Sequence, residues 1–569
     1  MRLPLWLSVF AGAVVLGSAC APGSARQEPI SSDNAARAER HFALAIEGEP
    51  GNLVSLMEGG GIGPGGVREA VQHHLAVYDD RANVRPQLAA ELPSTSNGTW
   101  IVRPDGTMQT TYRLRPGITW HDGVALNPRD FAFAVTVHQD STLPIGNANA
   151  ARAVRAVEPV DDLTFRIEWQ KTYPFAHALV EEDFGPFPTH LLEATYLSDK
   201  EKFPNLSYWK SEFVGTGPYK MVQWEPGSHL ILKAYDGFYA GRAKIENITV
   251  RFITSHQTMV ANLLAGTVDG TALDVLDFGE ISSVKREWEQ AGLRPLVVGS
   301  PRKWRVLGPQ LNPEVANPRE VLDVRFRKAM LHAVDRQVMA DVLFEGQSPI
   351  ADTVIPTNDP RWDWVKDVVV HYGFDQRMAT QLLTEVGWRR GADGQFVTAG
   401  GDPAVLPVWV VGDPQGQQEM AIVADSWKAL GVGVEQTVVP QAQQRDRRIR
   451  ASFPSFDVTS VPVAYANFTL RAYSEQCPSE RNQWSGNNRG CYMNPAYDRV
   501  VDSLNAAIDP ADQRNLYREL VRIYAQDLPV LPMYFKIDSA IFRDGVVGPN
   551  VPTPGPSLAW NIAEWDITR

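Results

Sequence analysis

Histidines and acidic side chains are the residues of this chain best suited to chemistry, but their spacing does not form a catalytic or metal-binding set. The 569-residue chain has eleven histidines. His73 and His74 are adjacent, and neighbours on a helix point about 100° apart, so they are poorly placed to share a metal ion. His177 and Glu181 stand four residues apart and would need a third ligand to hold a metal. We expect them to be a surface pair.

A catalytic interpretation has little support elsewhere in the chain. His121-Asp122 has the order of a general base and its orienting carboxylate, but Asp122 also begins a turn with Gly123, which explains the aspartate without a site. The sequence has no G-x-S-x-G, no H-E-x-x-H and no P-loop pattern. We therefore predict that the protein is not an enzyme, and that it has no catalytic residue, no metal ligand and no cofactor.

Residues 215–219, GTGPY, look at first like a phosphate-binding loop. The dinucleotide pattern would need glycine at position 220, where the chain has Lys220, and a helix that points at the phosphate. Instead, the strand-like runs YKMVQW and HLILKAY flank residues 225–228, EPGS, which have turn composition. The glycines are therefore better explained by backbone geometry that leads into a β-hairpin.

Composition and charge narrow the class of protein. The chain is 44% hydrophobic and 21% charged, which is ordinary for a globular protein, and its length allows two to four domains. The formal net charge is −12. Nucleic-acid-binding proteins usually carry a basic face, so this balance argues against a nucleic-acid partner.

The first twenty residues have the layout of a secretory signal. Arg2 precedes an apolar run to Leu16, and small residues then lead to Cys20. The alternative is a transmembrane anchor, for which about 14 apolar residues are short. The region resembles a bacterial lipobox, except that Gly17 stands where that pattern has leucine. The resemblance implies a signal peptide at 1–20, lipidation of Cys20 and a flexible tether at 21–40. It implies an exported protein that is lipid-anchored in the cell envelope, in the periplasm or on the outer face of the cytoplasmic membrane.

Two cysteines remain once Cys20 is set aside. Cys477 and Cys491 are the expected partners of a disulfide in an oxidising compartment. A loop of this length would gain about 3 kcal/mol of stability in the chain-entropy account. Two unpaired thiols are the alternative, and a metal site would need further ligands, since the intervening segment has no histidine.

Apolar periodicity predicts helices and strands in alternation along the rest of the chain. Asn127 is the expected cap of a helix that runs through about His138, and Gly266 is the expected left-handed residue after another. We expect strands at 41–46 and 161–171, hairpins within 99–115 and around 225–228, helices at 67–79, 323–344 and 375–387, and a helix–Gly431–strand unit within 418–439.

Four stretches, in this order, carry a family resemblance. They are YRLRPGITWHDGVALNPRDFAFAV, GTGPYKMVQWEPGSHLILKAYDGFYAG, LDVRFRKAMLHAVDRQVM and GFDQRMATQLLTEVGW. Together with NPAYDRVVDSL and LPVLPMYFK, they resemble the extracytoplasmic solute-binding proteins of ABC importers. The group is family 5, which includes oligopeptide-, dipeptide- and nickel-binding proteins. The match runs from about residue 41 to the end of the chain.

The resemblance implies an α/β, two-lobed fold of the periplasmic-binding-protein type (class II, cluster C) with an extra N-terminal subdomain. The first lobe would comprise 41–80, 205–300 and 536–569. Residues 81–204 would form the inserted subdomain, and 301–535 the second lobe. Chain crossings near 300 and 535 would form the hinge.

The implied function is that of a receptor without chemistry. It would capture an oligopeptide or similar small solute between the lobes, because a solute that contacts both walls only in the closed form shifts the open–closed equilibrium. The permease subunits of the importer would then receive the solute from a monomeric receptor. The alternatives are an exported hydrolase-like enzyme on the same scaffold, or a binding protein for a non-peptide solute (an oligosaccharide or a metal chelate) or for sensing.

Four residues are candidates for contact with the solute. Trp304 and Tyr534 lie where the chain crosses between lobes, and each is equally compatible with a core position. Tyr465 and Asn467 lie where peptide-binding members resemble W-x-A-D-Y-x-D-P-x-x-F, in which an aspartate pairs with the amino terminus of the peptide. This chain has no aspartate at Ala466 or Asn467. A neutral amide cannot supply the charge-assisted part of that hydrogen bond, so the residues support a peptide with a free amino terminus less well than the family resemblance alone does.

Four arginines precede this region. Arg445, Arg447, Arg448 and Arg450 fit a solvated helix face, which is the favoured interpretation, or one of them contacts a carboxylate of the solute.

Overall fold

The computed structural model describes residues 40–54, 67–145, 149–181, 183–551, 553–554 and 557–568. The predicted signal peptide, the lipidation of Cys20 and the tether up to residue 39 lie outside these residues. Among the helices that are described, none is both long and apolar enough to cross a bilayer.

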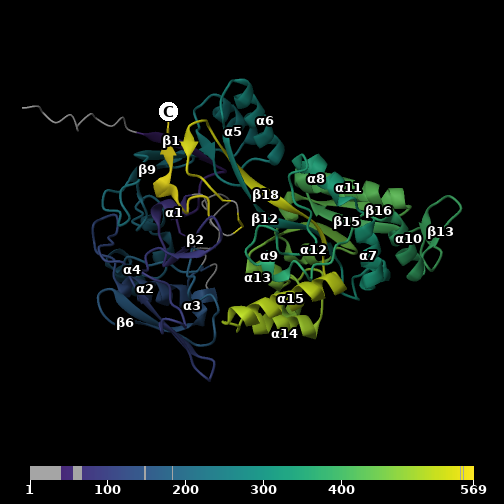
Figure 1. Cartoon of the computed structure of the whole chain (residues 1–569), viewed down its shortest axis with the longest axis horizontal. Coiled ribbons are helices and arrows are strands. Elements are labelled where there is room, and N and C mark those ends of the chain that lie inside the picture. The colour runs from purple at the N-terminus through teal and green to yellow at the C-terminus, as the bar shows by residue number, and fades with distance from the viewer. Residues whose placement is uncertain are drawn as a thin grey trace, which may run out of the picture. The chain divides into compact units, whose positions relative to one another are not determined.

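A mixed sheet of ten strands runs through the molecule (Figure 1). In spatial order the strands are β16 (Gly433–Val439), β15 (Val405–Val411), β17 (Phe456–Pro462), β12 (Leu296–Pro309), β18 (Leu531–Phe542), β11 (Gly270–Thr271), β1 (His41–Ile46), β10 (Asn247–Phe252), β9 (His229–Ala234) and β8 (Tyr219–Glu225).

Smaller sheets and the helices complete the architecture. A four-stranded sheet has the order β4 (Trp100–Val102), β5 (Met108–Arg113), β7 (Thr164–Trp169), β6 (Val154–Pro159). Two-stranded sheets pair β2 (Ala76–Tyr78) with β3 (Val84–Pro86), β13 (Arg389–Arg390) with β14 (Phe396–Val397), and β19 (Val546–Val547) with β20 (Asp566–Ile567). The α-helices are α1 (Arg68–Val71), α2 (Pro128–Gln139), α3 (Asn149–Ala153), α4 (Thr189–Ser198), α5 (His256–Leu264), α6 (Phe278–Gln290), α7 (Val324–His332), α8 (Arg336–Phe344), α9 (Trp362–Val365), α10 (Gln376–Glu385), α11 (Pro414–Leu430), α12 (Arg447–Ala451), α13 (Tyr465–Leu470), α14 (Pro495–Leu504) and α15 (Pro510–Asp527).

Buried apolar side chains form four cores that divide the molecule into two lobes. One core joins residues between 42 and 298 with residues between 540 and 565, and a second lies between 75 and 184, around the four-stranded sheet. The other two cores lie between 304 and 535. We call the part that shares the first two cores lobe I and the part that shares the other two lobe II.

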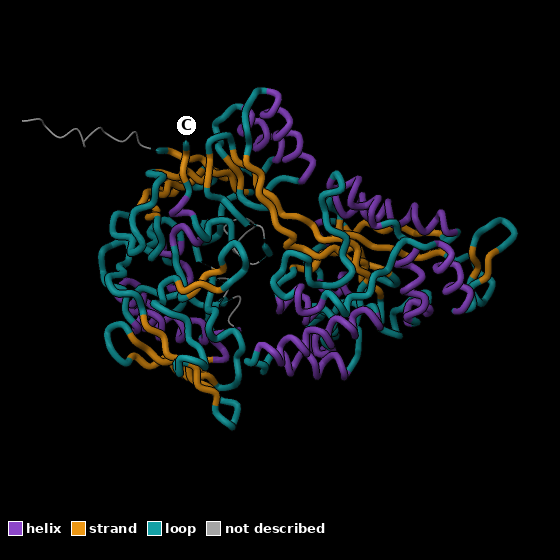
Figure 2. Tube along the Cα trace, in the orientation of Figure 1, coloured by secondary structure: helices purple, strands orange, loops and turns teal. Residues whose placement is uncertain are grey.

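The strands β12 and β18 connect these lobes. They pair antiparallel from Leu296–Phe542 to Leu307–Leu531, so the same two strands enter both lobes (Figure 2). In lobe II, one face of the sheet packs on α7, α8, α10 and α11, and the other packs on α9, α13, α14 and α15. The lobes also touch where the ring centroids of Phe278 on α6 and Phe344 on α8 lie 5.5 Å apart.

Most of the predicted elements are confirmed. The strand at 41–46, the strand within 161–171, both hairpins and the helix–Gly431–strand unit are present. Asn127 caps α2 in a capping box with Asp130, and Gly266 has a left-handed φ of 70° after α5. The two-lobed fold of mixed helices and strands is also the one predicted.

Two predicted helices are wrong in extent. The helix at 67–79 ends at Val71, because the Val71 carbonyl accepts the N–H of Gly217 (3.0 Å) and the chain then becomes extended. The helix at 323–344 is divided into α7 and α8. Asp335 divides it, since its carboxylate accepts the N–H groups of Gln337 and Val338 and so starts a new helix.

The GTGPY stretch is a close contact of backbones. A Cβ on Gly215 would lie 2.0 Å from the Val71 carbonyl oxygen, and one on Gly217 would lie 2.5 Å from that of Ala70. The imidazole of His121 closes the contact: its Nδ1 accepts from the N–H of Gly215 (3.1 Å) and its Nε2 donates to the Gly217 carbonyl (3.0 Å). Burial lowers the pKa of His121 to about 4, which keeps this ring neutral at neutral pH. Both glycines and His121 therefore hold the inserted subdomain to the rest of lobe I.

A partly buried ionic cluster lies at the crossing strands. The carboxylate of Asp274 contacts the ammonium groups of Lys303 on β12 and Lys536 on β18, the latter at 2.8 Å. Burial would raise the pKa of Asp274, but the two lysines outweigh it and lower that pKa to about 2. Burial and the charge of Asp274 together raise the pKa of Asp538, which lies 3.7 Å from Lys303, to about 6.

Replacing Gly217 tests the close backbone contact. Gly217→Ala forces a methyl group against the Ala70 carbonyl, and we expect the free energy of unfolding in urea to fall by about 2–3 kcal/mol. Gly279→Ala is the matched control, since a Cβ at that helical position meets nothing within 4 Å. The control should be neutral or stabilising by up to about 1 kcal/mol. Equal stability of the two variants would contradict the explanation.

The ionic cluster predicts a pH dependence of stability. Because Asp538 holds its proton more tightly in the folded chain, its contribution to stability is complete below about pH 4 and is lost as the pH rises through about 6. Asp538→Asn should therefore gain about 2–3 kcal/mol relative to the wild type between pH 4 and pH 7, in urea unfolding at a series of pH values. Asp402→Asn, at an exposed position, is the control, and its free energy of unfolding should follow that of the wild type across the pH series.

Candidate solute-binding site

Two of the four predicted contact residues are buried inside lobe II. Trp304 is 1% exposed and Tyr534 is 0% exposed. Because Trp304 and Arg305 are successive residues of β12, and Arg305 is in register with Tyr534, the two aromatic rings lie on opposite faces of the strand pair. The hydroxyl of Tyr534 donates to Glu419, which also binds Arg305, and accepts from Gln415. Both rings are enclosed in lobe II in this conformation, so their contact with a solute stays a prediction.

Trp304 differs from Tyr534 in one respect. Its indole N–H is buried and has no hydrogen-bond partner among the described residues, whereas the Tyr534 hydroxyl has two. A buried donor without a partner is uncommon and costs stability. Its ring packs edge-on against Tyr524, 5.9 Å between centroids.

The other two predicted residues lie on α13, at a contact between the lobes. The ring of Tyr465 lies 5.3 Å from that of Phe175 in the inserted subdomain, measured between centroids. Its hydroxyl donates to Asn505 at 3.1 Å. Asn467 is half-buried on the same short helix, and its side-chain amide makes no hydrogen bond to another described residue. Tyr465 and Asn467 therefore lie together on α13, where lobe II contacts lobe I.

A hollow of about 450 Å³ lies in lobe II, at the start of α12. It is lined by Gln444, Arg445, Arg447, Arg450, Trp484, Ser485, Gly486, Asn487 and Arg489. The described side chains that line it include four arginines and no acidic residue. Its volume is in the range of sites for small solutes.

One carboxylate lies behind this hollow. Asp457 on β17 is 1% exposed, and its Oδ2 accepts from Arg450 at 3.0 Å. Burial raises the pKa of Asp457, and Arg450, Arg489 and Arg471 oppose that rise. Burial and the neighbouring charge of Arg489 lower the pKa of Arg471 to about 10, so this guanidinium stays protonated at neutral pH.

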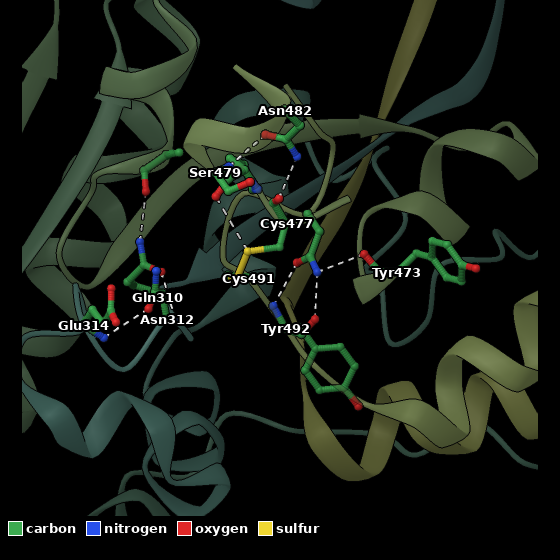
Figure 3. Close-up of a disulfide and its surroundings, with 12 residues drawn as sticks. Gln310, Asn312, Glu314, Tyr473, Cys477, Ser479, Asn482, Cys491 and Tyr492 are labelled. Atoms are coloured by element: carbon green, nitrogen blue, oxygen red, sulfur yellow. Dashed lines mark hydrogen bonds between the residues drawn. A yellow bond between two sulfur atoms is a disulfide. The ribbon is translucent and has the colours of Figure 1, made fainter. Parts of the chain in front are cut away.

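A disulfide holds the segment that supplies the far wall of the hollow. Cys477 and Cys491 are bonded, as predicted, with Cα atoms 4.7 Å apart (Figure 3). The side chain of Asn488, which is 1% exposed, donates to the carbonyls of Tyr473 and Tyr492 and accepts from the Tyr492 N–H, so these hydrogen bonds also fix the segment. The disulfide and these hydrogen bonds together position Trp484 and Arg489.

A small hollow in lobe I is not a solute site. It has a volume of about 30 Å³ and is lined by His74 and His138, among others. This is enough for one or two water molecules.

One group of side chains has the composition of a metal site. Donor atoms of His256, Asp277 and Glu280 lie within 4.8 Å of one another. Glu280 accepts from the Asp277 N–H (2.8 Å) in the capping box of α6 and also bonds His256 (2.9 Å), so helix capping accounts for the group. His177 and Glu181 have other contacts: His177 stacks on Trp100, and Glu181 accepts from Arg68.

Contact of one of the arginines at 445–450 with a solute carboxylate was the less favoured prediction, and the contribution of Trp484 and Arg489 was not predicted. Arg489 and Trp484 are far from α12 in the sequence, and periodicity gives no reason to join them. The cysteine pair was the one feature of the sequence that could have indicated this wall. A disulfide that brackets Trp484 and Arg489 closes their segment into a loop that can pack against α12.

Comparison with known proteins gives one family. The profile of the bacterial extracellular solute-binding proteins, family 5 (Middle), matches residues 83–466. The oligopeptide-binding protein AppA of Bacillus subtilis is 20% identical over 571 residues, with 99% of this chain and 98% of the relative covered.

Solved structures have the same fold. NikZ of Campylobacter jejuni, in complex with Ni(L-His), superposes with a TM-score of 0.71 at 20% identity, covering 92% of this chain and 99% of that one. An oligopeptide-binding protein of Thermus thermophilus, complexed with a pentapeptide, gives a TM-score of 0.69 at 20% identity, covering 93% and 96%. The ligands named for these structures differ in kind, so the fold by itself does not specify the solute.

The disulfide predicts sensitivity to reduction. Opening the loop should lower stability by about 3 kcal/mol and lower the apparent melting temperature. The measurement is thermal unfolding with and without dithiothreitol. A Cys477→Ser, Cys491→Ser double variant is the control and should show no response to the reductant. Two alkylatable thiols in the native exported protein would contradict the prediction.

Proposed function

Because this chain belongs to the bacterial extracellular solute-binding proteins, family 5, we propose that it is the receptor of an ABC importer and that it carries an oligopeptide or similar small solute to the permease. The observation that carries the proposal is the β12–β18 pair, which links two separately packed lobes. Two lobes on shared strands can close on a solute, and a solute that contacts both shifts the equilibrium toward the closed form.

We place the hinge where the chain crosses between lobes, near residues 300 and 535. The proposed lobes are 41–80, 205–300 and 536–569 for lobe I with its insert at 81–204, and 301–535 for lobe II. The four cores support this division, since their members fall on either side of these positions with few exceptions.

Tyr465 and Asn467 are the proposed solute contacts best supported by their positions. Tyr465 lies at a contact between the lobes, and the side-chain amide of Asn467 makes no hydrogen bond to another described residue, so its donor and acceptor are open to a solute. Trp304 and Tyr534 would reach a solute only after lobe II rearranges. Trp304 is the better candidate of the two, because its buried indole N–H has no hydrogen-bond partner among the described residues. Export, lipid anchoring through Cys20 and a monomeric state are further parts of the proposal, and they rest on the sequence of the leader and on the family.

An exported enzyme is the second candidate function. Native mass spectrometry of the freshly purified mature protein separates the two. The receptor proposal expects a stoichiometric co-purified small molecule, released by partial unfolding and intact in mass. Turnover of peptide or glycan mixtures that a single substitution abolishes would overturn it.

A variant of Tyr465 tests closure on a solute. Tyr465→Ala removes the ring that touches Phe175, so we expect about tenfold weaker binding of the co-purified solute by isothermal titration calorimetry. Tyr465→Phe is the matched control, because it keeps the ring and loses only the hydrogen bond to Asn505. If Tyr465→Ala binds as the wild type does, this contact does not belong to the solute-bound form.

A further inference from the structure

The arginine-lined hollow of lobe II concentrates positive charge on an acidic protein. Arg445, Arg447, Arg450 and Arg489 line it, while the whole chain has a formal net charge of −12. The four side chains come from two separate segments: three from α12 and the residues before it, and Arg489 from the disulfide-closed loop. Surface charges of one sign are normally spread apart or interleaved with the other sign, because close like charges repel.

Among the residues that the structure describes, Arg450 is the one lining arginine that forms an ion pair, and its partner is Asp457. The side chains of Arg445, Arg447 and Arg489 make no ion pair or hydrogen bond with any other described residue. The remaining nearby carboxylate, Asp446, accepts the N–H groups of Arg448 and Ile449 as the cap of α12.

Burial of part of this arrangement is costly without a counter-charge. Arg445 and Arg447 are exposed, whereas Arg489 is half-buried. Burial and the charge of Arg450 lower the pKa of Arg489, while the charge of Asp457 opposes that. Arg471 does not line the hollow; it is 7% exposed, and its guanidinium donates one hydrogen bond to the carbonyl of the lining residue Asn487 (3.1 Å). A charge that is partly removed from water is destabilising unless another charge or hydrogen bonds compensate it.

The lining has the donors that an oxyanion requires. Guanidinium groups bind carboxylate and phosphate through two parallel hydrogen bonds. Gln444 before α12 and Ser485 and Asn487 in the disulfide-closed loop add neutral donors to the lining. Trp484 is held by the guanidinium of Arg448, 5.5 Å from its ring centroid, on the outside of the hollow. Arg445, Arg447 and Arg489 thus line a space that has no acidic side chain in its lining among the described residues.

We propose that this hollow binds a multiply charged oxyanion, a phosphate or a di- or tricarboxylate, as the acidic part of the solute that the receptor carries. This assignment rests on the proposed function and makes it more specific: the solute has a negatively charged end. It also agrees with the absence of an aspartate at Ala466 and Asn467, because a solute recognised by its negative end does not need an amine contact there.

Solvated helix faces are the competing explanation for an arginine run. Arg445, Arg447 and Arg448 are exposed, as that interpretation predicts, and only Arg450 of the run is buried. A solvated face alone would not have a second segment opposite it. Here a covalently closed loop brings Arg489 and Trp484 opposite α12, and the volume between them is that of a small solute.

Calorimetric titration of the mature protein tests the proposal directly. The protein is freed of co-purified solute by partial unfolding and dialysis, and inorganic phosphate and citrate are titrated separately. We expect saturable binding of at least one of them at a single site, weakened by added salt because the interaction is electrostatic. Binding of phosphate alone indicates a phosphorylated solute, and binding of citrate alone indicates a polycarboxylate.

Single variants identify the site. Arg447→Gln and Arg489→Gln should each weaken the binding about tenfold, since each removes a charge-assisted pair. Arg377→Gln on α10 is the matched control, because it removes the same charge from an exposed position of lobe II that does not line the hollow. Thermal unfolding of each variant shows whether it is folded. No saturable binding of either anion, or binding unchanged in both lining variants, overturns the proposal.

The receptor role and the anion site fail in different ways. A co-purified solute without negative charge, bound equally by wild type and lining variants, overturns the anion site and leaves the receptor role intact. The opposite outcome has two parts: the lining arginines are needed for anion binding, but deletion of the protein leaves uptake of the identified solute unchanged. That outcome overturns the transport role and leaves the anion site intact.

Discussion

The pairing of β12 with β18 is the constraint on which the rest of the structure depends. These strands carry the only long ladder among the described residues that is shared by the cores of both lobes, from Leu296–Phe542 to Leu307–Leu531. Their hydrogen bonds keep the lobes joined, and the strand twist can change without breaking them. Register shifts interrupt the ladder at Pro301/Lys303 and Arg305/Val306, close to the Asp274 cluster. The proposed hinge therefore coincides with a short, irregular stretch of a paired ladder.

Backbone contacts attach the part of lobe I around the four-stranded sheet to the rest of that lobe. His121 bonds both Gly215 and Gly217, and Gly217 bonds Val71. Each of these contacts is buried, so water cannot replace it at low cost. The surface that meets lobe II at Tyr465 is thus carried by a rigid unit. This gives Phe175, in a loop, a fixed position relative to the hinge.

Local elements were predictable from the sequence, and the places where segments meet were not. Capping at Asn127, the left-handed Gly266 and the hairpin after GTGPY follow from short-range rules that act within a few residues. The helix at 67–79 was wrong because its end is set by Gly217, which is distant in the sequence. The same reason applies to the proposed sites. Tyr465 and Asn467 came from comparison with a family motif and stay a prediction, whereas the meeting of Arg447 with Arg489 depends on tertiary packing.

The position of the arginine hollow has a consequence for how the receptor would close. All of its lining residues come from lobe II, so an anion bound there gains the same contacts in the open and closed forms. Equal affinity for two conformations tightens binding without shifting the equilibrium between them. Closure must then be driven by the other end of the solute, through contacts with lobe I near the meeting of Phe175 and Tyr465. A solute with an acidic end and a variable remainder fits this division, in which charge supplies the affinity and the remainder selects what is carried.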